Sequence, residues 1–244
     1  MNPYETRKLL DEYLLFHYGS AAEILPWSGG PAEALDFPAR TVTELVDWPR
    51  LGSAGLRALD LGCAVGRSSF ELSKRCTEVI GIDFSSAFVE AARELKSRGV
   101  LAYERLEEGS LRTRLEAHLP EGSRPERVRF ETGDALNLRP DLGSFDVVHA
   151  ANLLCRLRRP RDFLRRAVDL VRRGGLLVLT TPATWMEEFT PRENWPDGEI
   201  LPFLESELSG SFELVHAKDM PFLIRETVRK YQWTVALGTV WERR

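Results

Sequence analysis

The sequence predicts an α/β fold with a central, mostly parallel sheet and helices on both faces. Short apolar runs that suit buried strands alternate with runs of helical periodicity between residues 56 and 181. The first apolar run leads into the glycine turn Gly62-Cys63-Ala64-Val65-Gly66, and the second ends in Asp83. Because right-handed crossovers join parallel strands, we expect this turn and this acid at the same edge of the sheet.

Composition limits the class of protein. The chain has 244 residues, of which 43% are hydrophobic and 29% charged, a composition typical of an ordinary globular protein. Its net charge of −4 gives no indication of the basic surface that nucleic-acid binding requires. The first eleven residues lack the apolar core of a signal peptide, and no run reaches the roughly 18 apolar residues of a membrane span. We therefore expect a cytoplasmic protein. Cys63, Cys76 and Cys155 form neither a disulfide framework nor a metal pattern, so no metal is expected.

The elements follow in order along the chain. We expect an N-terminal helical cap over residues 1–55, with helices at 3–18 and 37–49, and a second domain over residues 56–244. In that domain the patterns predict strands at 56–61, 78–82, 128–132, 145–150 and 175–181, and helices at 66–75, 85–97 and 160–172.

Two further segments complete the predicted fold. Residues 101–125 are charged and are predicted to hold one amphipathic helix through Leu106, Leu111 and Leu115. The runs 211–217 and 230–241 have no long helix between them, so they predict an antiparallel hairpin at the sheet edge and about seven strands in all.

The glycine turn favours an amino-acid-bearing cofactor over a dinucleotide. No glycine follows Gly66 at the spacing of the G-x-G-x-x-G motif. Asp60 would repel a pyrophosphate but suits an ammonium group, and the helix that begins at Arg67 attracts a carboxylate. S-adenosylmethionine has both groups. Asp83 suits its ribose hydroxyls, and Asp134, after the third strand, suits its adenine amino group.

These motifs resemble those of the class I S-adenosylmethionine-dependent methyltransferases over about residues 56–181, with Ala64 in place of the family's middle glycine. The resemblance implies a Rossmann-like fold with a seven-stranded sheet and S-adenosylmethionine as cofactor. Cys63 is expected to be a small packed residue, because this methyl transfer needs no protein thiol. The cofactor site that the resemblance implies consists of Asp60, Gly62, Cys63, Gly66, Asp83, Phe84, Ser85, Asp134, Ala135, Ala151 and Asn152.

Several runs outside this core resemble a narrower family, the methyltransferases of ovothiol biosynthesis. They include Tyr13-Leu14-Leu15-Phe16-His17-Tyr18-Gly19, residues 151–157, residues 189–195 and residues 229–233. That family methylates an imidazole nitrogen of 5-thiohistidine and forms ovothiol A and S-adenosylhomocysteine. There the domain often follows an iron-dependent sulfoxide synthase, so this chain resembles a stand-alone version. The expected partners are the small-molecule substrate and a pathway-linked synthase and lyase on separate chains, with neither nucleic acid nor membrane.

A thiohistidine acceptor would require four kinds of contact. Its carboxylate needs an arginine, for which Arg156, Arg192 and Arg225 are candidates, and its ammonium needs Glu193 or Asn194. Trp195 or Tyr231, or else Trp185 or Trp233, would form an aromatic wall, although Trp233 has apolar neighbours typical of a core strand. Candidate catalytic residues for the ring N–H are His17, Tyr18 and Asn152. The loop 185–196 is the strongest candidate substrate loop, because it follows the fifth strand.

Other functions remain open at this point. One alternative is a methyltransferase for another small amine, thiol or carboxylate. Another is a non-catalytic S-adenosylmethionine-binding module that regulates a partner, and a dehydrogenase is a more distant alternative.

Overall fold

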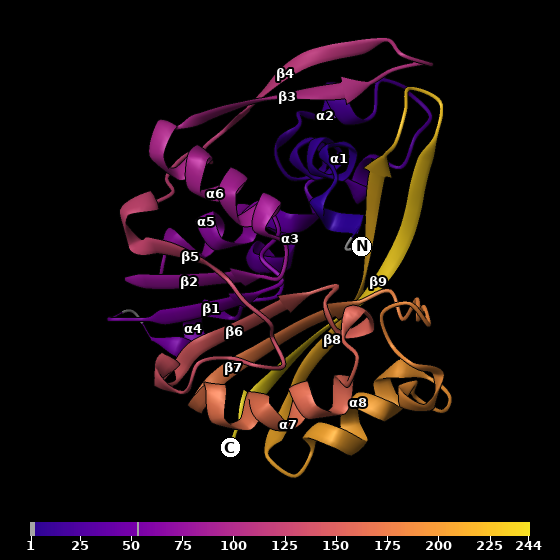
Figure 1. Ribbon diagram of the computed structural model, residues 1–244. Coiled ribbons are helices and arrows are strands. Elements are labelled where there is room, and N and C mark those ends of the chain that lie inside the picture. The colour runs from indigo at the N-terminus through magenta and orange to yellow at the C-terminus, as the bar shows by residue number, and fades with distance from the viewer. Residues whose placement is uncertain (1–2, 53) are drawn as a thin grey trace.

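The computed structural model describes residues 3–52 and 54–244 and contains one large twisted sheet between two layers of helices (Figure 1). The strand order is β5-β2-β1-β6-β7-β9-β8, in which the first five strands are parallel and β9 is antiparallel to both of its neighbours. This arrangement confirms the predicted parallel sheet and its antiparallel C-terminal hairpin. The strands are β1 Arg57–Leu61, β2 Glu78–Asp83, β5 Val128–Thr132, β6 Phe145–Ala151, β7 Val171–Thr181, β8 Phe212–Arg225 and β9 Tyr231–Arg243.

Each face of the sheet has its own hydrophobic core, because successive side chains of a strand point to opposite faces. Ala58 and Val147 pack into the core beneath α5 Arg67–Ser73 and α6 Ser86–Arg98. Leu59 and Val148, one residue further on, pack into the core beneath α7 Pro160–Leu170 and α8 Ile200–Leu208. The short 3-10 turns of the domain are η3 Pro125–Arg127, η4 Pro140–Leu142, η5 Leu154–Arg156 and η6 Arg192–Asn194.

The N-terminal cap is built into the first of these cores. Leu14, Leu15 and Phe16 are buried there beside the sheet residues. Helix α1 begins at Arg7, one turn later than predicted, because Thr6 caps it: its Oγ1 accepts a hydrogen bond from the Leu9 N–H at 3.3 Å. The elements of the cap are η1 Pro3–Glu5, α1 Arg7–Tyr18, α2 Ala21–Ile24, η2 Ala32–Ala34, α3 Phe37–Thr43 and α4 Trp48–Leu51.

The single helix predicted at 37–49 is wrong, since α3 ends at Thr43 and a new short helix begins at Trp48. Pro49 explains the division. Proline has no N–H for the hydrogen bond that a continuous helix would need there, but it is tolerated in the first turn of a helix, which is its place in α4.

The helix predicted within 101–125 is also wrong, because this segment forms a two-stranded antiparallel sheet of β3 Val100–Leu106 and β4 Arg112–His118. Residues Thr113, Leu115 and Ala117 recur at every second position, and each is less exposed than the charged residues between them. That period of two is the pattern of a strand with one covered face. In Figure 1 this hairpin lies over α1 and α2.

The β8–β9 hairpin extends beyond the parallel strands. The last pair that joins it to β7 is Thr181 with Leu237, whereas β8 and β9 continue together to Arg225 and Tyr231. Its turn reaches the β3–β4 hairpin, where the Val228 N–H donates to the Glu107 carbonyl at 3.1 Å (Figure 1). Trp233 is 55% exposed on this extension, so the expectation that it is a core residue is wrong. Across residues 3–52 and 54–244, no helix has the length and apolarity that crossing a membrane requires.

Candidate functional site

The glycine turn connects β1 to α5 at the carboxyl edge of the sheet. The N–H groups of Gly62 and Cys63 both donate to the Ile82 carbonyl, at 2.8 and 3.2 Å, which ties the turn to the end of β2. Gly62 and Gly66 have φ values of 71° and 89°, so both positions favour glycine. Ala64 has a φ of 47° and is held in the same left-handed region, at a cost of roughly 1–2 kcal/mol.

Asp83 lies beside this turn at the end of β2. Its Oδ2 accepts the Ala64 N–H at 2.8 Å and its Oδ1 accepts the Ser85 N–H at 2.9 Å. Burial raises the pKa of Asp83 to about 6, so the carboxylate is ionised at neutral pH. The adjacent Phe84 is 68% exposed, an unusual position for a large ring. An acid and an exposed ring at this place fit a ribose and an adenine.

Asp60 does not have the role that the sequence suggested. It is 1% exposed, its Oδ2 accepts the Ser69 hydroxyl at 2.5 Å, and its Oδ1 lies 2.7 Å from His149 Nδ1. His149 Nε2 in turn lies 2.9 Å from Thr41 Oγ1 on α3. Both carboxylate oxygens therefore have partners inside the protein, which join β1 to α5 and β6 and leave Asp60 with almost no exposed surface for a ligand ammonium group.

Cys63 has the expected packing role. The side chain is buried, and burial raises the pKa of its thiol, with the nearby carboxylates Asp83 and Asp60 adding to the effect. A protonated, buried thiol is a poor nucleophile.

Helix α1 brings His17 and Tyr18 against the turn. The Tyr18 hydroxyl donates to the Val65 carbonyl at 2.8 Å, and the His17 carbonyl accepts from Arg67 Nη1 at 3.1 Å. Burial, together with the positive charge of Arg67, lowers the pKa of His17 to about 3. The imidazole is therefore neutral and too weakly basic to remove a proton at neutral pH, which argues against His17 as a general base.

The N-terminal turn crosses the carboxyl edge of the sheet. The Ser85 hydroxyl donates to the Tyr4 carbonyl at 3.0 Å, and Glu5 Oε1 accepts the Ser86 N–H at 2.9 Å. The Tyr4 ring centroid lies 5.9 Å from that of Tyr13 and 6.0 Å from that of Phe189, which lies in the loop after β7. Tyr4 thus links the segment after β2 to the segment after β7.

The end of β6 supplies the opposite side of the site. Ala151 is half-buried as the last residue of the strand, and Asn152 has a φ of 53°. The Asn152 N–H donates to the Thr180 carbonyl at 2.8 Å, and its Oδ1 accepts the Thr180 hydroxyl at 2.9 Å. These bonds hold Asn152 against β7 and occupy one of its acceptor positions.

Arg156 lies one turn further on, in η5. Its Nη1 donates to the Thr184 carbonyl at 2.9 Å and to the Cys155 carbonyl at 3.2 Å. The guanidinium carbon lies 5.2 Å from the Phe189 ring centroid, within cation–π distance, and the Tyr4 side chain is hydrogen-bonded to it. The structure therefore brings Arg156, Tyr4 and Phe189 together.

The remaining residues of the predicted substrate loop lie elsewhere. Arg192 is 76% exposed and pairs with Glu187 at 3.8 Å, and Trp195 Nε1 donates to the Thr190 carbonyl at 2.8 Å. Glu193 and Asn194 belong instead to a shallow pocket of about 310 Å³. This pocket is lined by Asp134, Leu136, Arg158, Arg159, Pro191, Glu193 and Asn194.

Asp134 and Ala135 follow β5. Asp134 Oδ1 accepts the Leu136 N–H at 2.9 Å, and Ala135 is buried beside it. The shallow pocket thus joins the predicted adenine contact, Asp134, to Glu193 and Asn194.

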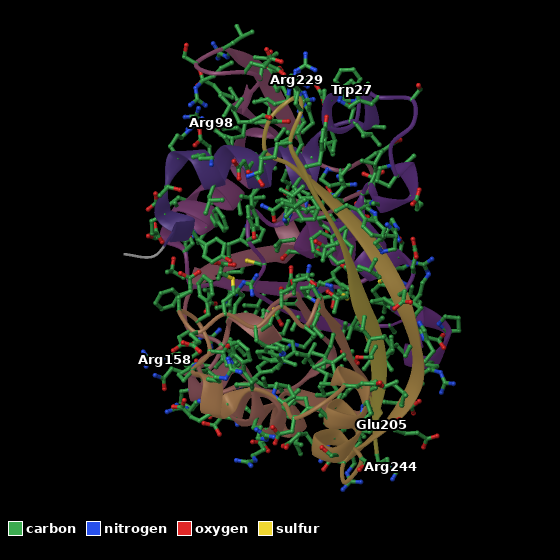
Figure 2. All side chains as sticks on the ribbon, turned by 90° about the vertical axis from the view of Figure 1, so that its right-hand side faces the viewer. Trp27, Arg98, Arg158, Glu205, Arg229 and Arg244 are labelled. Atoms are coloured by element: carbon green, nitrogen blue, oxygen red, sulfur yellow. The ribbon has the colours of Figure 1, made fainter. Side chains whose placement is uncertain are left out.

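Arg225 and Tyr231 are wrong as substrate ligands. Arg225 is 3% exposed, its Nη2 donates to Glu107 at 2.5 Å and its Nη1 to the Glu23 carbonyl at 2.7 Å. Tyr231 is its partner in the hairpin register and donates to the Val228 carbonyl at 3.2 Å. Figure 2 shows this end of the hairpin through Arg229, which lies near Trp27 and far from Arg158.

The sequence interpretation gave no role in the site to three residues, Tyr4, Tyr13 and Phe189. The spacing of four between Tyr13 and His17 is a signal for a shared helix face, and their rings stack with centroids 5.8 Å apart. No local signal marks Tyr4, because its role depends on contacts with the segments after β2 and β7.

Comparison with known proteins identifies the domain. Residues 59–177 match the family described as a methyltransferase domain. The chain is 27% identical over 149 residues to the magnesium-protoporphyrin O-methyltransferase of Rhodobacter capsulatus, covering 57% of this chain and 54% of the relative. It is also 27% identical over 199 residues to the tRNA U34 carboxymethyltransferase of Idiomarina loihiensis, covering 77% of this chain and 54% of the relative. The chain spans about half the length of these curated relatives.

A solved structure supports the fold alone. The cyclase SpnF superposes with a TM-score of 0.57 at 16% identity, over 96% of this chain and 93% of that one. Residues 59–177 thus match a methyltransferase domain, and the sheet order is that of the class I methyltransferase fold, for which S-adenosylmethionine is the implied cofactor. The surroundings of Asp83, Phe84 and the glycine turn fit that cofactor.

Proposed function

We propose that this chain, which carries a class I S-adenosylmethionine-dependent methyltransferase domain, methylates an imidazole nitrogen of 5-thiohistidine and forms ovothiol A. The observation that carries the proposal is the cluster that Tyr4, Tyr13, Phe189 and Arg156 form at the carboxyl edge of the sheet. Aromatic rings beside one cation suit a small, flat acceptor with an anionic group. The runs that resemble the ovothiol family supply these residues, apart from Tyr4.

The proposed chemistry asks little of the protein beyond alignment and exclusion of water. S-adenosylmethionine supplies a methyl group on a positively charged sulfur. The acceptor nitrogen forms the new N–C bond while the S–C bond breaks, the bonding electron pair stays on sulfur, and the ring proton leaves to solvent. Holding the two reactants in line is worth several powers of ten in rate. A neutral imidazole nitrogen already has its lone pair available, which suits a site whose own His17 is too weak a base.

The cap supports this proposal through its position. The Tyr18 hydroxyl is hydrogen-bonded to the glycine turn. Tyr4 contacts Ser85, after β2, and Phe189, after β7, so it spans the carboxyl edge of the sheet between these strands. An N-terminal segment in this position would keep water from the sulfonium group. The proposed enzyme works in the cytoplasm and receives its substrate through the action of an iron-dependent sulfoxide synthase and a lyase.

The experiment that tests the function compares acceptors. Purified protein is incubated with S-adenosylmethionine and either 5-thiohistidine or histidine, and formation of S-adenosylhomocysteine is followed by mass spectrometry. We expect kcat/KM to be at least about tenfold higher for 5-thiohistidine, because a sulfur atom at this ring position adds both contact area and charge. Asp83→Ala, which removes the proposed ribose ligand, serves as the control for contaminating activity.

Other outcomes favour the alternatives. Equal rates for the two acceptors, or a higher rate for another small amine or thiol, would assign a different substrate. Binding of S-adenosylmethionine with no methyl transfer to any acceptor would favour the regulatory module.

A further inference from the structure

Arg156 has a set of contacts that lacks a carboxylate. The groups that contact its guanidinium are the Cys155 and Thr184 carbonyls, the Cys155 sulfur at 3.3 Å, the Tyr4 side chain and the Phe189 ring. Among residues 3–52 and 54–244, no Asp or Glu forms an ion pair with it. These neutral partners fix the orientation of the guanidinium and leave its positive charge without a counter-charge.

The other arginines considered for the same role differ from Arg156. Arg225 is paired with Glu107, and Arg192 points to solvent beside Glu187. Arg156 alone of the three is half-buried at the carboxyl edge of the sheet. A cation that is partly removed from water and has no internal counter-ion attracts an anionic group strongly.

The surroundings of Arg156 also indicate whether it lies nearer to the cofactor or to the acceptor. Its contacts come from η5 after β6, from Thr184 and Phe189 after β7, and from Tyr4 in the N-terminal turn. None of these contacts comes from the turn 62–66, which adjoins Asp83. Arg156 therefore lies beside the ends of β6 and β7, away from the glycine turn, and this is the side at which we expect the acceptor.

We propose that the guanidinium of Arg156 binds the carboxylate of the acceptor and so selects an α-amino acid over its decarboxylated amine. The proposal rests on the proposed function for the identity of the amino acid. The Phe189 ring lies within cation–π distance of the guanidinium and the Tyr4 side chain hydrogen-bonds to it, so these two residues keep the planar fork in one orientation.

The test separates the two carboxylates that Arg156 could bind, that of the acceptor and that of the cofactor's methionine. KM is measured for 5-thiohistidine and for its decarboxylated amine with the wild type, Arg156→Gln and Arg156→Lys, and the Kd of S-adenosylhomocysteine is measured by calorimetry. Arg165→Gln, an exposed arginine on α7, is the matched charge control.

We expect Arg156→Gln to raise KM for 5-thiohistidine at least tenfold, to leave KM for the amine within twofold, and to leave the Kd of S-adenosylhomocysteine within twofold. Arg156→Lys should recover part of the loss, because it restores the charge without the fork. Arg165→Gln should behave as the wild type.

Three results would overturn the proposal. A tenfold weaker affinity for S-adenosylhomocysteine in Arg156→Gln would assign the guanidinium to the cofactor. An equal rise in KM for the acid and the amine would assign it a purely structural role, and a wild type that prefers the amine would contradict an anion site. A wild type that ignores 5-thiohistidine but methylates another amino acid through Arg156 would contradict only the proposed function.

Discussion

Adding a single methyl group at Gly66, the last glycine of the turn, should destabilise the protein strongly. A Cβ added there would lie 2.6 Å from Phe130 Cζ and 3.2 Å from Ala92 Cβ, and Gly66 has a φ of 89°. The left-handed backbone costs an L-residue about 1–2 kcal/mol. Overpacking against a buried ring costs about 1–3 kcal/mol more. We therefore expect Gly66→Ala to lower the free energy of unfolding by roughly 2–5 kcal/mol.

Gly99 supplies the matched control. It has a φ of 79° at the C-terminal cap of α6, but an added Cβ would meet no atom within 4 Å. Gly99→Ala should therefore cost only the backbone term of about 1–2 kcal/mol. Urea unfolding, followed by circular dichroism, measures both free energies, and the difference between the two variants isolates the contact with Phe130.

A double variant tests the assigned cause. If the Phe130 ring is the obstacle, the smaller side chain of Phe130→Leu should make Gly66→Ala less costly than it is alone, with a coupling energy of about 1–3 kcal/mol. The reasoning is refuted if Gly66→Ala costs no more than Gly99→Ala. It is equally refuted if the two substitutions Gly66→Ala and Phe130→Leu are additive.

Three further predictions follow from other contacts. Because burial raises the pKa of Asp83 to about 6, the Kd of S-adenosylhomocysteine should rise about elevenfold between about pH 8 and pH 5, and Asp83→Asn should remove this dependence in calorimetry. His149→Leu should lower the free energy of unfolding by roughly 3–5 kcal/mol, because it leaves Asp60 buried without that partner, and an unchanged urea midpoint would contradict this. Arg225→Met should lower the urea midpoint and leave KM for the acceptor within twofold, whereas a large rise in KM would return Arg225 to the substrate site.

The parallel core could be predicted because its signals are local. The five parallel strands β1, β2, β5, β6 and β7 each contain apolar residues in a short run, and the glycine turn and Asp83 lie directly at the ends of β1 and β2. The spacing of Leu106, Leu111 and Leu115 is compatible with a helix, whereas the alternation of Thr113, Leu115 and Ala117 is the signal for the strand β4 that forms there. Pro49 was the available signal for the break between α3 and α4.

The acceptor side could not be predicted in the same way, because partner choice is a tertiary property. Arg225 is a plausible carboxylate ligand in the sequence, but its partner Glu107 lies 118 positions away and reaches it only through two hairpins. Asp60 has the motif position of a ligand, yet His149 and Ser69 occupy both of its oxygens. The role of Tyr4 likewise requires Phe189 and Ser85 to meet at one edge of the sheet.

The most direct test of the proposed function is the position of the transferred methyl group. The wild-type protein is incubated with 5-thiohistidine and S-adenosylmethionine that carries a carbon-13 label in its methyl group, and the product is examined by mass spectrometry and nuclear magnetic resonance. The proposed function predicts one labelled methyl group per product molecule, bonded to an imidazole nitrogen, with one S-adenosylhomocysteine formed for each. A label on sulfur, on the amino group, or in no product at all would contradict it.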